Sequence, residues 1–122
     1  MWQAASNSLN HMLEQEAYIS NGGVTEETVA KWKKEHGRVW ELDVPVRDKV
    51  HRGYLRKMKR HEFSRASTFI SRDEPYKLGE YALENCWLGG DEEILNDEDL
   101  FIGAAFQAGQ IFDFPKGTIQ EV

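Results

Sequence analysis

The chain has 122 residues, the usual length of one domain with its own hydrophobic core. Hydrophobic residues make up 40% and charged residues 30%, a balance that is ordinary for a globular domain and argues against a disordered chain. The single cysteine, Cys86, excludes an internal disulfide, and no apolar run approaches the roughly 18 residues of a membrane-spanning helix. Because the first residues show no signal-peptide pattern, we expect a soluble, intracellular protein.

The net charge of −6 is unevenly distributed along the chain. Residues 1–65 carry 12 Lys and Arg against 9 Asp and Glu, whereas residues 66–122 carry 3 against 12. Such asymmetry concerns the partners of a protein rather than its fold.

The first 23 residues are predicted to form a helical arm. Apolar residues at helical spacing follow a possible N-cap at Ser6 or Asn7, and Asn21-Gly22-Gly23 then interrupts the pattern. We therefore expect an arm at residues 1–23 and a single domain at residues 24–122. A frayed terminus is the alternative for the arm.

A helix followed by a β-hairpin is predicted next. Thr25 is a good N-cap, and Gly37 stands where a helix C-terminus favours glycine. Residues 38–44 alternate between apolar and acidic side chains, which is typical of a strand with one buried face. A turn at residues 45–49 and a returning strand at residues 50–56 complete the hairpin. Helices must cover its apolar face, because an isolated hairpin is barely stable.

The second half of the chain reads as helices. Helical spacing is clearest at the end of residues 57–71, and Pro75 marks the start of another helix. Gly89-Gly90 is expected to end that helix, Asn96 to cap the next one, and Pro115 to stop the last apolar stretch. The predicted fold is α+β, with a two-stranded antiparallel hairpin packed by three to four helices.

The segment from Asn85 to Ile94 combines a thiol, two glycines and three acids. We interpret it as a corner between two helices, with Cys86 buried and the acids capping the second helix. Trp87 is a candidate interface anchor, because tryptophan is enriched at binding hot spots. Core packing is the alternative for this ring.

The run from Arg47 to Arg65 holds eight Lys and Arg in 19 residues. It has three readings: nucleic-acid binding, contact with a protein partner, or a solvated charged face. The low isoelectric point, near 5.2, weighs against nucleic acid. The residues that would serve a nucleic-acid-associated factor are Lys49, Arg52, Arg56, Lys57, Lys59 and Arg60.

No catalytic, cofactor-binding or metal-binding residue is predicted. The acids from Asp91 to Asp99 do not form a calcium loop, because Ile94 and Leu95 occupy the centre and no glycine follows to turn the chain. No histidine stands at ligand spacing from Cys86 or from another histidine. The absence of any recognisable catalytic motif leads us to expect a protein that is not an enzyme.

Several of these blocks resemble small proteins of tailed bacteriophages and prophages. The blocks are Lys31-Trp32-Lys33-Lys34, Gly37-Arg38-Val39-Trp40, Tyr54-Leu55-Arg56 and the stretch from Leu83 to Ile94, and the resemblance covers about residues 24–115. Some members of this group are similar to tail assembly chaperones.

The resemblance implies a non-enzymatic morphogenesis or virion protein in the cytoplasm of a bacterial host or in the virion. Such chaperones coat a hydrophobic tape-measure protein and recruit tail-tube subunits. The implied partner is a phage tail or virion protein, or a second copy bound head to tail through opposite charges. The expected interface residues are Trp87, Asp91, Glu92, Glu93, Arg52, Arg56, Lys57, Lys59 and Arg60.

Overall fold

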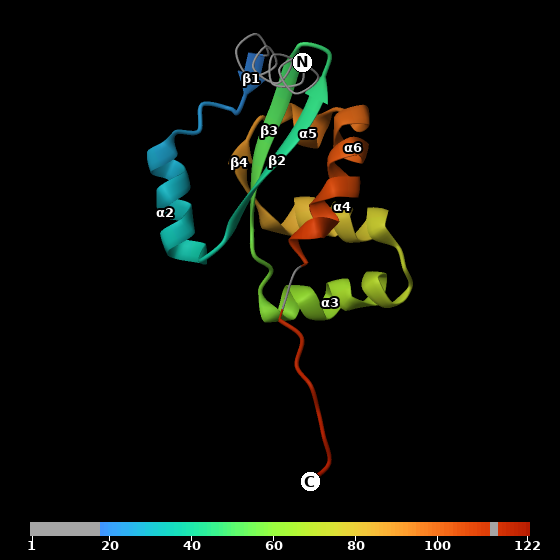
Figure 1. Ribbon diagram of the computed structural model, residues 1–122. Helices are drawn as coiled ribbons and strands as arrows, with labels where there is room; N and C mark the ends of the chain where they lie inside the picture. Colours follow the sequence, from blue (N-terminus) through green and yellow to red (C-terminus); the bar gives the residue numbers. More distant parts are fainter. Residues whose placement is uncertain (1–17, 113–114) are drawn as a thin grey trace, which may run out of the picture.

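The computed structural model describes residues 18–112 and 115–122. It confirms a small α+β domain, in which helices pack on a four-stranded mixed sheet (Figure 1). The elements in chain order are β1 (Tyr18–Ser20), α2 (Glu26–His36), β2 (Val39–Val46), β3 (Lys49–Arg56), α3 (Arg60–Ser71), α4 (Pro75–Cys86), β4 (Trp87–Gly90), α5 (Glu93–Asn96), α6 (Glu98–Ala108) and the 3-10 helix η1 (Gly109–Ile111).

Strand β3 is the centre of the sheet, so the predicted two-stranded hairpin is only part of it. β2 runs antiparallel along the whole length of β3, from Val39 opposite Arg56 to Val46 opposite Lys49. The other side of β3 is shared by two short strands: β1 lies parallel to its first half and β4 antiparallel to its second half. Chain segments from before and after the hairpin therefore meet beside the middle of β3.

The hairpin follows the predicted alternation but its turn is shorter than predicted. β2 continues through Pro45 to Val46, and only Arg47 and Asp48 form the turn. Pro45 is accommodated because β2 is an edge strand, where every second residue points its backbone nitrogen away from the ladder. Arg47 adopts a positive φ of 57°, a conformation common in two-residue hairpin turns.

Different helices cover the two faces of the sheet (Figure 1). On one face Leu42 and Leu55 join the core formed with α4 and α6. On the other face Trp32 of α2 packs on Tyr54, with ring centroids 5.7 Å apart. α2 begins and ends as predicted: Thr25 accepts a hydrogen bond from the Thr28 amide, and the Gly37 amide donates to Lys33.

Helices α4 and α6 approach closely because their facing residues are small. Ala104 and Ala105 of α6 are fully buried. Their partner on α4 is Gly79, where an added Cβ would lie 1.5 Å from the carbonyl oxygen of Ala105. The largest fully buried side chains among the described residues are Leu55, Leu83, Cys86 and Ile94.

The predicted helix–turn–helix corner after Asn85 is wrong. α4 ends at Cys86. Trp87–Gly90 then forms strand β4 on the side of β3 that faces away from β2. Gly90 still adopts a positive φ of 135°, but within a strand end rather than a turn. α5 then forms a separate turn of helix, and Asp97, not Asn96, caps α6 by accepting a hydrogen bond from the Leu100 amide.

The predicted arm is only partly described. Residues 1–17 lie outside the described residues, and residues 18–20 form strand β1 rather than a helix. This end of the expected arm is therefore joined to the sheet of the domain through β3.

Within residues 18–112 and 115–122, no helix is long and apolar enough to cross a membrane. Residues 115–122 are exposed and form neither helix nor strand.

Candidate functional site

A groove of about 830 Å³ lies between α4 and the α5–α6 segment. Its floor and walls combine aromatic and aliphatic side chains with acidic ones, and none of the described residues that line it is Lys or Arg. The lining residues are Tyr76, Glu80, Leu83, Glu84, Trp87, Leu95, Asn96, Asp97, Glu98, Phe101 and Ile102. An open apolar groove whose charged residues are all acidic is suited to a ligand that is both cationic and apolar.

Trp87 has a structural and a surface role in this groove. Its ring lies so close to Gly53 of β3 that a Cβ there would be 2.3 Å from the ring. The side chain is half-buried against the core and also lines the groove. The ring thus packs on the core, and its role as an interface anchor stays a prediction.

The acidic rim affects the ionisation of Tyr76 at the end of the groove. Tyr76 packs against Phe106 of α6, with ring centroids 5.4 Å apart. Partial burial, then the charge of Glu80 and its hydrogen bond, raise the pKa of the Tyr76 phenol. Glu80 and Glu84 therefore place negative charge beside this end of the groove.

The three acids predicted for the interface lie in different environments. Asp91 is buried, where Nδ1 of His51 lies 2.7 Å from its Oδ2. Burial disfavours its charge, but hydrogen bonds from His51, from the Glu93 amide and from Ser20 outweigh this and lower its pKa. Glu92 and Glu93 are exposed at the start of α5 and do not line the groove.

Arg52, one of the predicted basic interface residues, is engaged within the chain. It makes a two-point hydrogen bond to Asp43 on the neighbouring strand, at 2.7 and 3.0 Å, and also contacts Glu41. Asp43 and Arg52 are opposite each other in the β2–β3 register. The opposite charges of Arg52 and Asp43 therefore largely neutralise each other.

Arg56 is also engaged within the chain. Its guanidinium meets both oxygens of Glu62 at 2.8 Å and donates a third hydrogen bond to the carbonyl of Asn85 at 2.6 Å. The hydrogen bond from Arg56 is the main reason that the pKa of Glu62 falls to about 2. Glu62 also accepts from the Lys59 amide, so this pair fixes the start of α3.

The remaining cations of the predicted basic surface are more exposed. Lys57, Lys59 and Arg60 lie at the junction of β3 and α3, and Lys49 lies 3.8 Å from Glu93 at the opposite end of β3. The nucleic-acid hypothesis therefore retains three clustered cations rather than six, because Arg52 and Arg56 are paired and Lys49 is distant along the strand.

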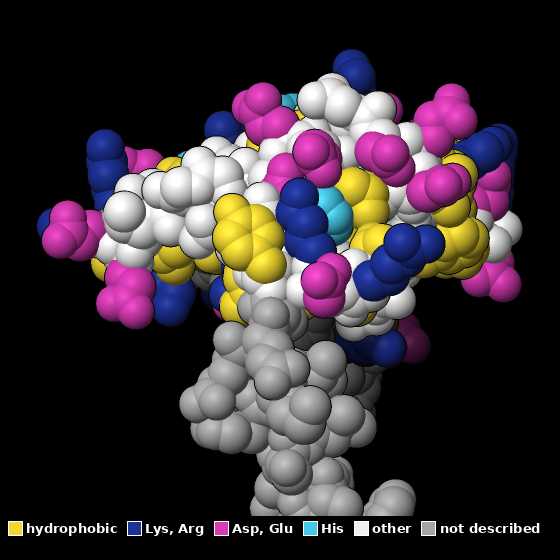
Figure 2. All heavy atoms as spheres, turned by 90° about the horizontal axis from the view of Figure 1, so that it is seen from above, with side chains coloured by type: hydrophobic (Ala, Val, Ile, Leu, Met, Phe, Trp, Pro, Cys, Tyr) yellow, Lys and Arg dark blue, Asp and Glu magenta, His cyan; other side chains and the backbone are white. Residues whose placement is uncertain are grey.

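A side-chain cluster that sequence spacing did not indicate forms where β1, β3 and the β4–α5 corner meet. His51 and Asp91 are buried, and the exposed Glu93 reaches the same place. One ligand atom from each of the three lies within 4.8 Å of the others. Seen from this end of the molecule, acidic, basic and histidine side chains are interspersed (Figure 2). These residues are up to 42 positions apart, so only the strand pairing unites them.

Cys86 is a buried thiol, as predicted. Burial raises its pKa to about 11, so almost none of it is thiolate at neutral pH. Nucleophilic chemistry at this position has no support from the geometry.

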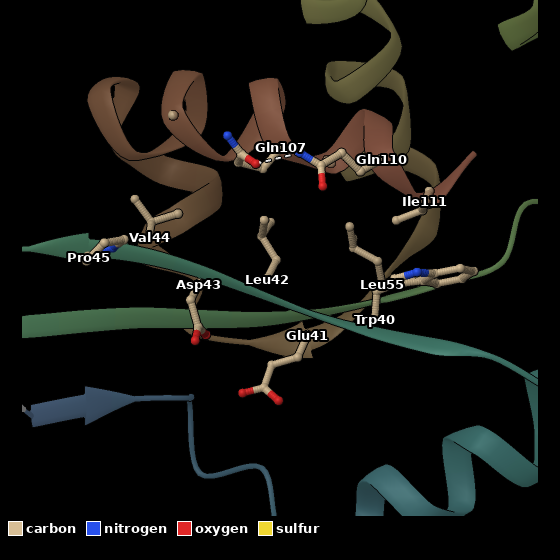
Figure 3. A pocket seen from close by; sticks show the side chains of 12 residues that line it. Trp40, Glu41, Leu42, Asp43, Val44, Pro45, Leu55, Gln107, Gln110 and Ile111 are labelled. Carbon is tan, nitrogen blue, oxygen red and sulfur yellow. Dashed lines mark hydrogen bonds between the residues drawn. The ribbon is translucent and has the colours of Figure 1, made fainter. Parts of the chain in front are cut away.

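A second hollow, of about 430 Å³, lies between β2 and the α6–η1 segment (Figure 3). Leu42, Val44 and Leu55 point toward the helix, whereas Glu41 and Asp43 point to the opposite face of the sheet. The polar side chains on its helical wall, Gln107 and Gln110, are hydrogen-bonded to each other at 2.8 Å (Figure 3). This hollow presents little free polar chemistry, so the acidic groove is the better candidate site.

No protein family, curated protein or solved structure matches this chain, so the site is interpreted from its own geometry.

Proposed function

We propose that this protein is a non-enzymatic binding module whose acidic groove holds a basic segment of a partner protein. The observation that carries the proposal is the composition of the groove: aromatic and aliphatic surface from Trp87, Phe101 and Ile102 beside the carboxylates of Glu80 and Glu84. The matching ligand is a peptide segment with one or two apolar anchors flanked by Lys or Arg. Apolar anchors supply most of the affinity at such sites, and charges set orientation and encounter rate.

The resemblance to tailed-phage proteins supports a setting for this binding. A chaperone-like morphogenesis protein holds a segment of another virion protein until assembly, and an open groove suits reversible capture. Within that setting the partner is a tail or other virion protein with a basic, apolar segment. The groove replaces Asp91, Glu92 and Glu93 as the acidic half of the expected interface, and Trp87 is retained.

Selection of peptides from a displayed random library tests the chemistry of the groove. We expect the enriched sequences to carry Lys or Arg beside an aromatic or aliphatic residue. The variant Glu84→Lys should weaken their binding about tenfold or more at low salt, because it reverses a charge in the groove. The control Glu92→Lys makes the same charge change on α5, outside the groove, and should leave the affinity nearly unchanged.

A second pair of variants tests the apolar contact. Ile102 lines the groove and is 44% exposed, so Ile102→Ser should preserve the fold while weakening peptide binding. Ile70 on α3 is 46% exposed and lies outside the groove, so Ile70→Ser is the matched control. Equal affinities of the two variants, or enriched peptides without basic residues, would reject the groove as the binding site.

Self-association is the other occupant to be distinguished. A second copy would have to offer Lys57, Lys59 and Arg60, but the apolar neighbour in that segment, Met58, is buried. We therefore expect light scattering to show monomers at low salt and high concentration. Salt-sensitive oligomers that Glu84→Lys dissolves would instead identify a second copy as the ligand of the groove.

A further inference from the structure

We propose that His51, Asp91 and Glu93 form a binding site for a divalent transition-metal ion, such as Zn²⁺ or Mn²⁺. The site is separate from the groove and belongs to the junction of β1, β3 and α5. One imidazole and two carboxylates are the nitrogen and oxygen ligands that borderline divalent ions accept in proteins.

The distances among the three ligand atoms are close to those that a metal ion requires. Nδ1 of His51 lies 2.7 Å from Oδ2 of Asp91 and 3.7 Å from Oε2 of Glu93. Ligands at bond lengths of about 2.1 Å in tetrahedral or octahedral arrangement are about 3.0–3.4 Å apart. The two distances from His51 therefore need changes of only a few tenths of an ångström. The ligand atoms of Asp91 and Glu93 lie within 4.8 Å of each other, and the exposed Glu93 side chain can move to bring them to the required separation.

The two buried ligands are already oriented. Oδ1 of Asp91 accepts a hydrogen bond from the Glu93 amide at 3.0 Å, which directs Oδ2 toward His51. The Asp91 amide in turn donates to the carbonyl of Arg52 at 2.8 Å, which fixes this corner against β3. Hydrogen bonds of this kind set the direction of metal-binding carboxylates.

Metal binding would replace the hydrogen bond between His51 and Asp91. Nδ1 binds the ion through its lone pair, so the neutral imidazole must then carry its proton on Nε2. Lys49 competes for the third ligand, because its Nζ lies 3.8 Å from Oε2 of Glu93. The side chain of Glu93 is 63% exposed and that of Lys49 is 36% exposed, so the contact is weak and Lys49 can move away when the ion arrives.

The ion would join β3 to the β4–α5 corner. His51 is opposite Ser20 in the β1–β3 register, and Asp91 connects β4 to α5. A ligand that binds only the folded state raises its stability in proportion to the logarithm of its concentration above Kd. The site would therefore act as a clamp between β3 and the β4–α5 corner.

Calorimetric titration of the chelator-treated full chain with Zn²⁺, and separately with Mn²⁺, tests the proposal. We expect one ion per chain, with Mg²⁺ binding much more weakly because it prefers oxygen ligands alone. Glu93→Gln removes one exposed ligand without disturbing the core and should lower the affinity at least about tenfold. Lys49→Gln removes the competing cation and should raise it.

Matched controls separate this site from adventitious binding by other histidines. Glu92→Gln changes the neighbouring exposed acid, and His36→Gln changes a histidine on α2; neither should alter the affinity. Paramagnetic broadening by Mn²⁺ should centre on residues around His51. Lack of binding at millimolar metal, unchanged affinity in Glu93→Gln, or broadening centred on another histidine would overturn the proposal.

Discussion

The contact between α4 and α6 makes Gly79→Ala the sharpest test of the fold. An added methyl group at Gly79 would lie 1.5 Å from the carbonyl oxygen of Ala105, where ordinary contacts begin at 3.4 Å. The obstacle is backbone, which cannot rotate away as a side chain can, so the two helices must separate by about 2 Å. Separation would loosen the packing of Ala82 and Ala104, both fully buried.

The magnitude follows from two opposing effects of Gly79→Ala. Replacing a helical glycine by alanine gains up to about 1 kcal/mol of helix propensity. Overpacking of a close helix contact costs about 1–3 kcal/mol, and more where backbone must move. Because the clash here is severe, we expect a net loss of about 2 kcal/mol, or about 8 °C in Tm for a domain of this size.

The assay is thermal and urea unfolding of three proteins. Gly103→Ala is the matched control, because it lies on the exposed side of α6 and its added Cβ would be 3.8 Å from Val44. It should stabilise the protein by up to about 1 kcal/mol. Equal stability of Gly79→Ala and Gly103→Ala would show that the helices do not pack as described.

Three further predictions concern β4, the Arg56–Glu62 pair and the thiol. Gly90→Val should lower the free energy of unfolding by well over 1 kcal/mol in urea titrations. The reason is that Gly90 has a φ of 135° and an added Cβ would lie 2.6 Å from the carbonyl oxygen of Arg52. Parent-like stability of this variant would contradict the position of β4. Because the folded-state pKa of Glu62 is depressed from 4.5 to about 2, its pairing with Arg56 stabilises the fold fully above pH 4.5 and is lost as pH falls toward 2. Glu62→Gln should therefore be less stable than the parent at pH 6, by at most about 3 kcal/mol, and the difference should shrink by pH 2.5; a difference independent of pH would refute the pairing. Cys86 should react with a thiol reagent at pH 8 only at the rate of unfolding, and rapid reaction of the native protein would contradict its burial.

The parts of the fold that sequence predicted well are those with local signals. The caps of α2 at Thr25 and Gly37, the alternation along β2 and the start of α4 at Pro75 depend on residues within a few positions of one another. The burial of Cys86 also followed from its place on an apolar helix face.

The strands β1 and β4 were missed because their own residues give no strand pattern. Trp87–Gly90 is short and half glycine, and it forms a strand only because the edge of β3 offers unpaired backbone groups. Tyr18–Ser20 is in the same position on the first half of β3. Tertiary pairing decided both segments, and the expected glycine turn was a reasonable but incorrect reading of local preference.

The candidate sites show the same limit. The pairing of Asp43 with Arg52 follows from the hairpin register, and a correct two-residue turn would have predicted it as a cross-strand ion pair. The cluster of His51 with Asp91 had no comparable signal, since their separation of 40 positions is closed only by β3–β4 pairing. Predicting the groove would have required the angle between α4 and α6, which no sequence pattern specifies.

The most direct test of the proposed function is a map of the peptide-binding site by amide and indole NMR shifts. A selected basic, apolar peptide would be titrated into labelled protein at low salt. Shift changes should centre on the groove, with the largest at the Trp87 indole and at Phe101 and Ile102. Shifts centred instead on Lys57–Arg60, or on the hollow beside Trp40, would contradict the claim that the acidic groove binds the partner.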